Sequence, residues 1–262
     1  QGRIVGYRYD NANRRTALIY PGGNKLDYRY FDNGRLKEIE DWHGGITSYE
    51  YFSAGNLKSR RLPNGISSKM TYDFQNRLKS LGHVDASLVS VLPSYPRDFS
   101  YDRAGNLTTF SAAAGTETYG YDNIYRLTDV EFTNHDTQHY TFDRAGNRTT
   151  LVENGTTTTN YAYNAANGIL SATGIPFQHD GNGNMTLKDG LLFSWDFRNQ
   201  LRQVGNPAGV FASYLYDGVG RRTQRTFTDP GGSEVREYVY DGINVIQEYG
   251  SSPDSVHGLE RG

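Results

Sequence analysis

An aromatic residue recurs along the chain at intervals close to 21 residues, and this internal repeat restricts the fold more than any other feature of the sequence. The intervals between successive copies are 21, 21, 21, 29, 20, 21, 21, 16, 16, 21 and 24 residues. Self-similarity at a short, nearly fixed period is typical of repeat architectures, in which each repeat is one small structural unit. The recurring residue, called the anchor below, is Tyr9, Tyr30, Tyr51, Tyr72, Tyr101, Tyr121, Phe142, Tyr163, His179, Trp195, Tyr216 and Tyr240.

A second aromatic residue stands two positions before eleven of the twelve anchors, and the two positions together hold 22 of the chain's 35 aromatic residues. A spacing of two places both rings on the same face of a β-strand. The pattern therefore predicts a short strand that ends at each anchor and carries a pair of rings on one face. The residues at this earlier position are Tyr7, Tyr28, Tyr49, Met70, Phe99, Tyr119, Tyr140, Tyr161, Phe177, Phe193, Tyr214 and Tyr238.

The residues directly after each anchor predict a tight turn. Counted from the anchor, position 1 is aspartate in nine units, and position 4 is glycine in six and asparagine in five. Glycine and asparagine tolerate positive φ, and aspartate followed three residues later by such a residue is typical of a type I turn with a G1 bulge. The clearest examples are Asp102 with Gly105, Asp143 with Gly146, and Asp217 with Gly220, and further turn aspartates are Asp122, Asp196 and Asp241.

Position 5 is then arginine or asparagine in most units, and position 6 is usually apolar and should start a return strand. Each unit is expected to end in a looser polar turn, such as Pro21-Gly22-Gly23-Asn24, Pro63-Asn64-Gly65 or Pro230-Gly231-Gly232. We therefore predict an all-β chain of about twelve tandem hairpins, with roughly 24 strands and little or no helix. The 29-residue interval, which contains Pro93 and Pro96, should hold a loop.

Composition narrows the class of protein. Hydrophobic residues make up 36% of the chain, and the net charge of −2 gives no electrostatic reason to expect a nucleic-acid partner. Cysteine is absent, so neither disulfides nor thiolate metal sites are available. The apolar runs are too short for a membrane-spanning segment. Because the sequence starts at Gln1 without methionine, we expect a piece of a longer protein.

Three groups of polar residues are candidates for sites of chemistry. His135 and His139 have the spacing of zinc ligands on a helix, but a hairpin end exposed to solvent is favoured here. Residues 180–184 mimic the start of an EF-hand loop, although Met185 stands where glycine is needed; weak calcium binding by turn aspartates stays open. Glu38 and Glu40 occupy alternate strand positions and indicate a solvated face. We predict no catalytic, cofactor-binding or metal-binding residues.

The many tyrosines allow two interpretations. Aromatic rings beside Asp, Asn and Arg suit sugar binding, because a ring offers an apolar face and the polar groups bond hydroxyls. Alternatively, the rings stack as ladders along the sheet, where each cross-strand pair contributes about 0.2–1 kcal/mol. The ladder is favoured, and binding of a cell-surface glycan or protein is kept as the alternative function.

Two segments carry a family resemblance. Residues 101–108, YDRAGNLT, and residues 142–149, FDRAGNRT, resemble the YD repeat, which is the RHS-type repeat of bacterial polymorphic toxins, toxin-complex C components, wall-associated proteins and teneurins. The resemblance extends over essentially the whole chain. Residues 214–222 and 238–248 resemble the closing repeats of an RHS core, and residues 257–262 resemble the segment directly after such a core.

The resemblance implies a long, curved antiparallel sheet that spirals as part of a hollow shell. It also implies a role: a non-enzymatic shell segment that encloses or presents a C-terminal toxin or effector, in a secreted or cell-surface protein. Partners would be the chain's own C-terminal passenger and neighbouring repeats. On this view residues 1–250 form the hairpin array and residues 251–262 form a tail that leads to a downstream region. The self-cleavage motif of toxin members finds no match here.

Geometry adds one expectation. Open sheets of more than about ten strands tend to curl or split, so a strip of roughly 24 strands should coil. Its first strand should be an exposed edge, which invites pairing with another strand unless a partner covers it.

Overall fold

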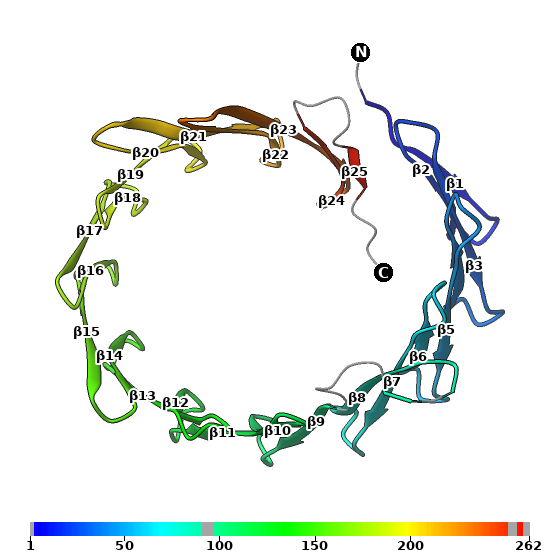
Figure 1. Cartoon of the computed structure of the whole chain (residues 1–262), viewed down its shortest axis with the longest axis horizontal. Helices are drawn as coiled ribbons and strands as arrows, with labels where there is room; N and C mark the ends of the chain where they lie inside the picture. The colour runs from blue at the N-terminus through cyan, green and yellow to red at the C-terminus, as the bar shows by residue number, and fades with distance from the viewer. Residues whose placement is uncertain (1–2, 88, 91–96, 251–255, 259–262) are drawn as a thin grey trace. The chain divides into compact units, whose positions relative to one another are not determined.

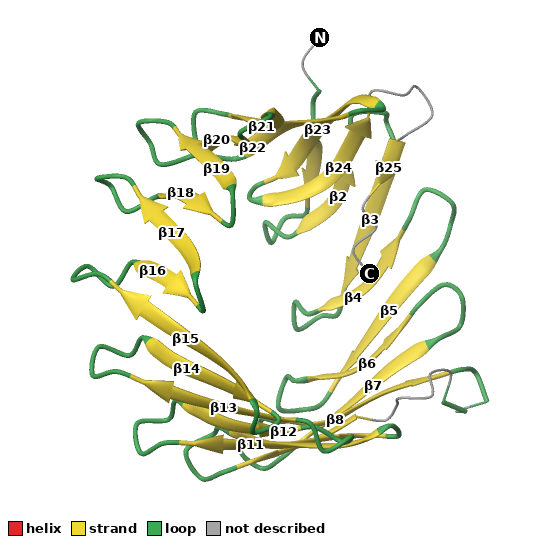
Figure 2. Cartoon of the chain, turned by 60° about the vertical axis from the view of Figure 1, so that its left-hand side comes forward, coloured by secondary structure: helices red, strands yellow, loops and turns green. Residues whose placement is uncertain are grey.

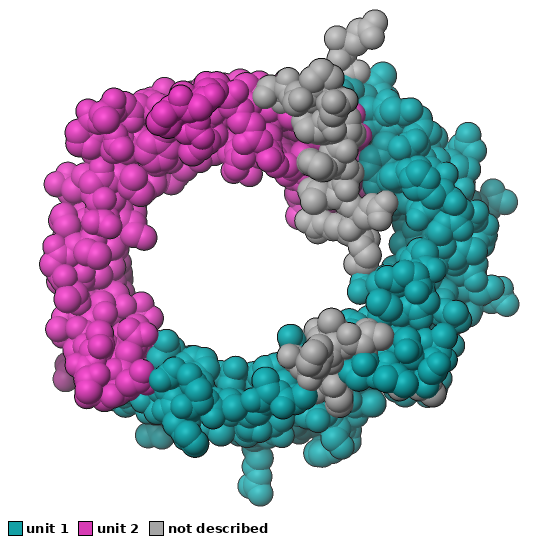
Figure 3. Space-filling view, in the orientation of Figure 1, with its two compact units in different colours: residues 1–139, 262 teal, residues 140–261 magenta. Residues whose placement is uncertain are grey.

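The computed structural model describes residues 3–87, 89–90, 97–250 and 256–258, and in these residues every regular element is a β-strand (Figures 1 and 2). Two compact units are distinguished, unit 1 with residues 1–139 and 262, and unit 2 with residues 140–261 (Figure 3). The all-β fold class is confirmed.

The strands of unit 1 are β1 (Gly6–Tyr9), β2 (Arg15–Ile19), β3 (Lys25–Tyr30), β4 (Leu36–Glu40), β5 (Ile46–Tyr51), β6 (Leu57–Arg61), β7 (Ser67–Tyr72), β8 (Leu78–Val84), β9 (Arg97–Tyr101), β10 (Leu107–Ala112), β11 (Gly115–Tyr121) and β12 (Leu127–Glu131). β13 (Thr137–Phe142) contains the division between the units. Unit 2 continues with β14 (Arg148–Glu153), β15 (Thr157–Tyr163), β16 (Ile169–Ala172), β17 (Ile175–His179), β18 (Met185–Lys188), β19 (Leu191–Trp195), β20 (Leu201–Asn206), β21 (Gly209–Tyr216), β22 (Arg222–Asp229), β23 (Gly232–Asp241), β24 (Asn244–Gly250) and β25 (Val256–Gly258).

Successive strands pair antiparallel. In unit 1, β1 pairs with β2, β2 with β3 and β3 with β4, and the same order continues along the chain. In unit 2 it runs from the β14–β15 pair to the β24–β25 pair. Each anchor except Tyr240, which is followed by one more strand residue, ends one strand of a hairpin, so the predicted tandem of hairpins is confirmed.

The turn after the anchor has the predicted geometry in eleven of the twelve repeats. In the Asp102 turn, the N–H of Gly105 donates to the Asp102 main-chain oxygen at 3.3 Å, and the N–H of Asp102 donates to the Asn106 oxygen at 3.0 Å. Gly105 has φ of 98°, and the pairing register shifts beside the turn, as a G1 bulge requires. In the predicted turn at Asp122, one feature was not anticipated: position 4 is Tyr125, which is neither glycine nor asparagine and still has φ of 66°.

The turn after Tyr240 differs from the prediction. Asp241 pairs directly with Asn244, which leaves a two-residue loop, and Gly242 rather than Asn244 has positive φ, at 59°. A glycine directly after aspartate permits the tighter hairpin, because two-residue loops need positive φ at their first central residue. The expectation of a standard turn at this anchor was therefore wrong.

The expectation that the connecting turns are looser was also wrong. Between Tyr20 and Asn24 the N–H of Gly23 donates to the Tyr20 oxygen at 2.9 Å, which is the same three-residue loop, and the segment from Leu62 to Ile66 repeats it. Proline favours the second place of a type I turn, so Pro21-Gly22-Gly23 folds as tightly as Arg103-Ala104-Gly105. Pro230 and Gly231 form a two-residue loop between Asp229 and Gly232.

Each unit is a single layer of strands, without a second sheet stacked on the described ones (Figure 2). The accessible surface of the chain is 16502 Å², whereas a compact protein of this mass exposes about 11,500 Å². The buried apolar set is correspondingly small and includes Leu18, Val130 and Val204. Stability must therefore come mostly from the strand ladder and from contacts between neighbouring hairpins.

The loop predicted around Pro93 and Pro96 lies outside the described residues. Before it, Asp85 accepts hydrogen bonds from the N–H groups of Ser87 and Val89, at 2.8 and 3.0 Å. Within the long interval, β8 and β9 pair at Ser80 and Asp98.

Candidate functional site

The residues considered as zinc ligands do not form a metal site in the described part of the chain. His135 has φ of 68° and lies in the loop of the β12–β13 hairpin, with its side chain exposed. His139 lies on β13, and its Nδ1 is 2.7 Å from a carboxylate oxygen of Asp129. In the described residues, no three His, Cys, Asp or Glu side chains gather to hold a metal ion.

The EF-hand-like segment is an ordinary hairpin turn. Asp180 Oδ1 accepts the N–H groups of Asn182 and Asn184, both at 2.9 Å, and Oδ2 accepts the Asn184 side-chain amide at 2.9 Å. Both carboxylate oxygens are thus bonded within the turn, and the side-chain bond from Asn184 is the largest of the causes that lower the pKa of Asp180. Local bonding of this kind is the usual role of turn aspartates.

Glu38 and Glu40 are joined by an arginine from the neighbouring strand. Arg29 donates to Glu38 at 3.3 Å and to Glu40 at 2.5 Å. These three side chains lie on the face opposite to the anchor rings, as their positions along β3 and β4 require. The carboxylates are paired with a fixed cation, which suits a structural surface.

Among the described contacts between neighbouring repeats, the one that recurs most often is a hydrogen bond from an anchor side chain to the preceding repeat. Tyr30 donates its phenolic O–H to the main-chain oxygen of Arg15 at 2.7 Å, and Trp195 donates its indole N–H to Met185 at 2.7 Å. In every case the acceptor is position 6 of the preceding unit. The further pairs are Tyr101 with Leu78, Tyr121 with Leu107, Tyr163 with Arg148, Tyr216 with Leu201 and Tyr240 with Arg222, at 2.6–2.9 Å.

The carbonyl at position 6 accepts this bond because the ladder between units stops short of it. β2 and β3 pair from Ala17 to Ile19, and β10 and β11 pair from Thr109 to Ala112, so the ladder to the next repeat begins two residues beyond Arg15 and Leu107. An unpaired main-chain oxygen is costly when it is removed from water. The anchor ring fills the place beside it and supplies the missing donor.

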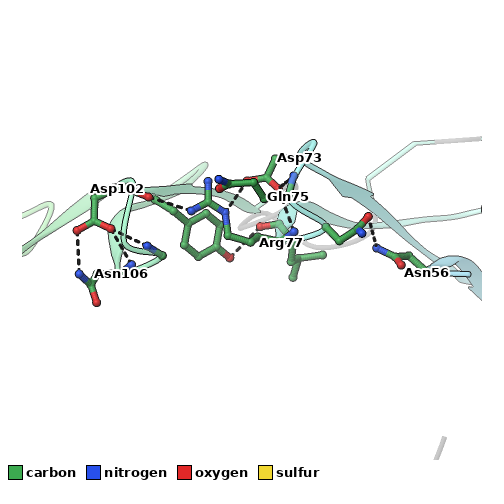
Figure 4. Close-up of polar contacts among 10 residues, drawn as sticks. Asn56, Asp73, Gln75, Arg77, Asp102 and Asn106 are labelled. Carbon is green, nitrogen blue, oxygen red and sulfur yellow. Dashed lines mark hydrogen bonds and ion pairs between the residues drawn. The ribbon is translucent and has the colours of Figure 1, made fainter. Parts of the chain in front are cut away.

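Position 5 forms a second link between neighbouring units when it is arginine. Arg77 Nε donates to Asp73 Oδ2 at 2.7 Å, and Nη1 donates to the main-chain oxygen of Asp102 at 2.9 Å (Figure 4). Its guanidinium carbon lies 4.7 Å from the centre of the Tyr101 ring. Arg14 and Arg35 make the corresponding contacts with Tyr30 and Tyr51, at 4.9 and 5.6 Å.

When position 5 is asparagine, the link takes a shorter form. Asn147 Nδ2 donates to Asp143 Oδ2 in its own turn and to Asn167 Oδ1 in the next turn, both at 2.9 Å. Asn184 and Asn199 repeat this bond between turns at 2.8 Å, and Asn56, which is labelled in Figure 4, donates to Asn76 at 3.4 Å. The acceptor is the position-4 asparagine of the following unit.

Arginine at position 6 lies between tyrosines of two neighbouring repeats. The Arg148 guanidinium carbon is 5.6 Å from the Tyr140 ring centre and 4.5 Å from that of Tyr161, and Nη2 donates to the Tyr161 hydroxyl at 2.7 Å. Arg222 lies 5.6 Å from Tyr214 and 4.9 Å from Tyr238. Stacked cation–π contacts of this kind favour the ladder interpretation of the aromatic residues.

A basic cluster in unit 1 was not anticipated from the sequence. Arg60, Ser68 and His83 lie opposite one another on β6, β7 and β8. Ser68 is 1% exposed, and its Oγ is 3.0 Å from His83 Nδ1. Burial lowers the pKa of His83, and the charges of Arg60 and Arg97 lower it further. No periodic signal marks this row, because it forms only across three strands.

The predicted repeat residues thus fall into two roles. Seven anchors donate a hydrogen bond to the preceding repeat, whereas the aspartates and the position-4 residues shape the turn within one repeat. Asn76, Asn167 and Asn199, at position 4, also accept a bond from the preceding repeat. Sequence reasoning noted arginine and asparagine at position 5 but assigned them no role. The signal was the recurrence of these two residue types in nine of twelve units.

Similarity to known proteins extends over the same repeats. Residues 107–247 match the family model Teneurin YD-shell. The tRNA nuclease WapA of Bacillus subtilis is 33% identical over 116 residues, which are 42% of this chain and 5% of that protein. The probable deoxyribonuclease RhsB of Dickeya dadantii is 26% identical over 283 residues, covering 94% of this chain and 18% of that protein. The chain therefore spans a small part of the length of these curated relatives.

Solved structures share the fold. The Photorhabdus luminescens Tc holotoxin pore with a TccC3 mutation aligns with a TM-score of 0.77 at 17% identity, over 94% of this chain and 15% of that chain. The TcdB2–TccC3 complex with Cdc42 gives a TM-score of 0.77 at 19% identity over the same shares. No described helix has the length and apolar character needed to cross a membrane. The expected RHS/YD-repeat relationship is confirmed, and the chain belongs to the Teneurin YD-shell family.

Proposed function

We propose that this chain is a wall segment of a shell that encloses or presents a C-terminal passenger, and that the segment itself catalyses no reaction. The observation that carries the proposal is the pairing of each hairpin with the next, reinforced at seven described junctions by an anchor hydrogen bond and at several by a position-5 side chain. Such a strip resists opening, which is what a wall needs. The family and the structural neighbours support a structural role.

The remaining features of the proposal concern its extent and location. Residues 1–250 would form the array, and residues 251–262 would lead to the passenger. A secreted or cell-surface location suits a shell of this family. The relatives that are named as nucleases are much longer proteins, of which this chain covers 5–18%. We therefore propose that a nuclease activity, where the parent protein has one, lies outside residues 1–262.

Limited proteolysis of the longer parent protein, with its own C-terminal region, tests the proposal. We expect the passenger to be cut much more slowly in the parent than when it is expressed alone. A parent that carries Gly105→Val and Gly146→Val serves as the matched control, because two disturbed hairpins should make the wall leaky and the passenger sensitive. Equal cleavage of the passenger in the parent and alone would contradict enclosure.

Glycan binding is a second candidate, favoured by rings at the hairpin tips. Phe74 is 94% exposed and Phe197 is 86% exposed. Strand rings such as Tyr101 are less available, because a guanidinium group covers them. Binding on a glycan array that is lost in Phe74→Ala and Phe197→Ala, but kept in Tyr101→Phe, would support this function. Binding that survives both alanine changes would contradict it.

A further inference from the structure

Arg60 departs from the pattern of the other repeats in unit 1. In five of the six repeats described there, the residue two positions before the anchor pairs across the hairpin with an apolar residue. In the remaining repeat, Tyr49 pairs with Arg60. A cation therefore stands where the sheet otherwise places an apolar side chain. The five apolar partners are Leu18, Ile39, Leu81, Phe110 and Val130.

Two further cationic or titratable side chains share the face of Arg60. Ser68 pairs with Arg60 on one side and with His83 on the other. Arg97 pairs with Leu81, which stands two residues before His83. Because residues two apart in a strand share a face, Arg60, His83 and Arg97 lie on one face of the four adjacent strands β6 to β9. All three are partly exposed, so a ligand in solvent can reach them.

No carboxylate of the described strands β5 to β9 lies on this face. These strands contain two carboxylates, Glu50 and Asp98. Each directly follows a residue of this face, so each points to the opposite face of the sheet. The Nε atom of Arg60 is buried and has no hydrogen-bond partner in the described part of the chain. A buried donor without a partner is costly, so an acceptor from outside the sheet would stabilise it.

An arginine in unit 2 shows what an internal countercharge looks like at the same position. Arg225 occupies the place in its hairpin that Arg60 occupies in unit 1. Arg225 Nη2 lies 3.6 Å from a carboxylate oxygen of Glu234, on the neighbouring strand β23. The residue directly opposite Arg60 on its neighbouring strand is Ser68, which carries no charge. The sheet thus supplies a negative charge to Arg225 and none, among the strands described, to Arg60.

Ser68 determines how the ring of His83 is presented. Ser68 is 1% exposed, and its Oγ lies 3.0 Å from His83 Nδ1. When the hydroxyl donates to Nδ1, the neutral imidazole carries its proton on Nε2. When the imidazole is protonated, Nδ1 donates to the hydroxyl and Nε2 keeps its proton. Nε2 is therefore an N–H donor in both states, on the side of the ring away from Ser68.

We infer that Arg60, His83 and Arg97 form a binding site for a phosphate group on this face of unit 1. Two guanidinium groups supply two fixed positive charges and planar sets of donors, which suit the oxygens of phosphate and carboxylate alike. A phosphate group is favoured because its charge of about −2 matches two arginines. A single carboxylate would leave one guanidinium group without a countercharge. The inference concerns one face of three strand pairs and does not depend on the proposed shell function.

The titration midpoint of His83 tests the site. It is followed by NMR of the imidazole protons in inorganic phosphate and in sodium chloride of equal ionic strength, and His83→Gln assigns the resonance. A bound dianion stabilises the imidazolium form, so we expect phosphate to raise the midpoint by about 0.5–1 pH unit relative to chloride. Sodium acetate should raise it clearly less. Equal midpoints in phosphate and chloride would overturn the site, and an equal effect of acetate would overturn its assignment to phosphate.

Two neighbouring arginines provide matched variants. Arg60→Gln removes a donor of the site, whereas Arg61→Gln removes the same charge from an exposed side chain on the opposite face. We expect Arg60→Gln to reduce the phosphate-dependent shift at least threefold and Arg61→Gln to leave it unchanged. Arg60→Leu, which restores the apolar residue of the other repeats, should lose the shift and keep the fold. Equal reductions in the two glutamine variants, or a full shift in Arg60→Leu, would overturn the site.

Methyl phosphate distinguishes two sources of the phosphate group. A midpoint raised as much by the ester as by inorganic phosphate would assign the site to a phosphate group carried on a larger ligand. A midpoint raised by inorganic phosphate alone would assign it to the free anion. Failure of both probes would overturn the site while leaving the proposed shell function untouched, because that function is tested by protection of the passenger.

Discussion

Tyr101 donates its phenolic O–H to the main-chain oxygen of Leu78 at 2.9 Å, although 23 residues separate them in the sequence. The longest interval between anchors, 29 residues, lies between Tyr72 and Tyr101. The same bond forms across intervals of 21 and 16 residues, as between Tyr30 and Arg15 and between Trp195 and Met185. The geometry of the junction is thus maintained, and extra residues are accommodated between the hairpins.

Removing the hydroxyl at an internal junction should destabilise unit 1. Tyr101→Phe leaves the Leu78 oxygen without its donor, and we expect a loss of about 1 kcal/mol in the free energy of unfolding. Tyr9→Phe is the control, because Tyr9 is 56% exposed and the change should cost less than about 0.5 kcal/mol. Urea unfolding of both variants measures the difference. Equal stabilities would show that the junction bond contributes nothing.

The position-5 arginine should contribute through three contacts at once. Arg77→Ala removes the ion pair with Asp73, the bond to the Asp102 oxygen and the contact with the Tyr101 ring. We expect Arg77→Ala to lower the free energy of unfolding by about 1–2 kcal/mol. Arg77→Lys should have a stability between those of Arg77→Ala and the natural protein, because lysine keeps the charge but lacks the planar donor group. Arg103→Ala, at an exposed loop tip, is the control and should stay within about 0.5 kcal/mol of the natural protein. A lysine variant as stable as the natural protein would reduce the role of Arg77 to its charge.

The position-4 glycine should be needed for its backbone conformation and not for space. Gly105 has φ of 98°, and an added Cβ would meet nothing within 4 Å. Gly105→Val should cost about 2 kcal/mol, because a β-branched residue disfavours positive φ. Gly105→Asn should cost clearly less, since asparagine holds this position in other units. Thermal unfolding separates the two variants, and similar melting temperatures would argue against backbone strain as the cause.

Acid should weaken the turns through their aspartates. The side-chain hydrogen bond from Asn106 is the largest cause that lowers the pKa of Asp102 below its usual 3.8. The unfolded chain then takes up the proton first, so this stabilisation is present above the unfolded pKa and is lost as the pH falls through the folded pKa. Asp102→Asn should make stability decline less steeply between pH 5 and about 2. Asn164 shows that asparagine supports the same turn, since its Oδ1 accepts the N–H groups of Ala166 and Gly168. Identical pH profiles would contradict the prediction.

His83 should make unit 1 sensitive to mild acid. Burial, followed by the charges of Arg60 and Arg97, lowers the pKa of His83 below 6.5. The unfolded chain binds the proton more readily, so stability falls as the pH drops through about 6.5 and levels off below the folded pKa. His83→Gln should remove this step without affecting the decline below pH 4. Persistence of the step in the variant would assign it to another group.

The local structure of each hairpin could be predicted from the sequence alone. The spacing of two between rings predicted strands, and aspartate followed by glycine or asparagine predicted the turns, because both patterns depend on residues within one hairpin. The turn after Tyr240 was missed because Gly242 competes locally for the residue with positive φ, and the Pro21 and Pro63 turns proved as tight as the anchor turns.

The contacts that hold neighbouring hairpins together could not be predicted from the sequence and are seen only in the folded chain. The donor of Tyr101, the acceptor at Leu78 and the guanidinium of Arg77 belong to different strands. Periodicity reveals that such residues recur but not which atoms meet. The row of Arg60, Ser68 and His83 was likewise invisible, since it depends on the register of three strands. Contacts across strands form only once the strands have paired in their register, which the turn type and loop length fix.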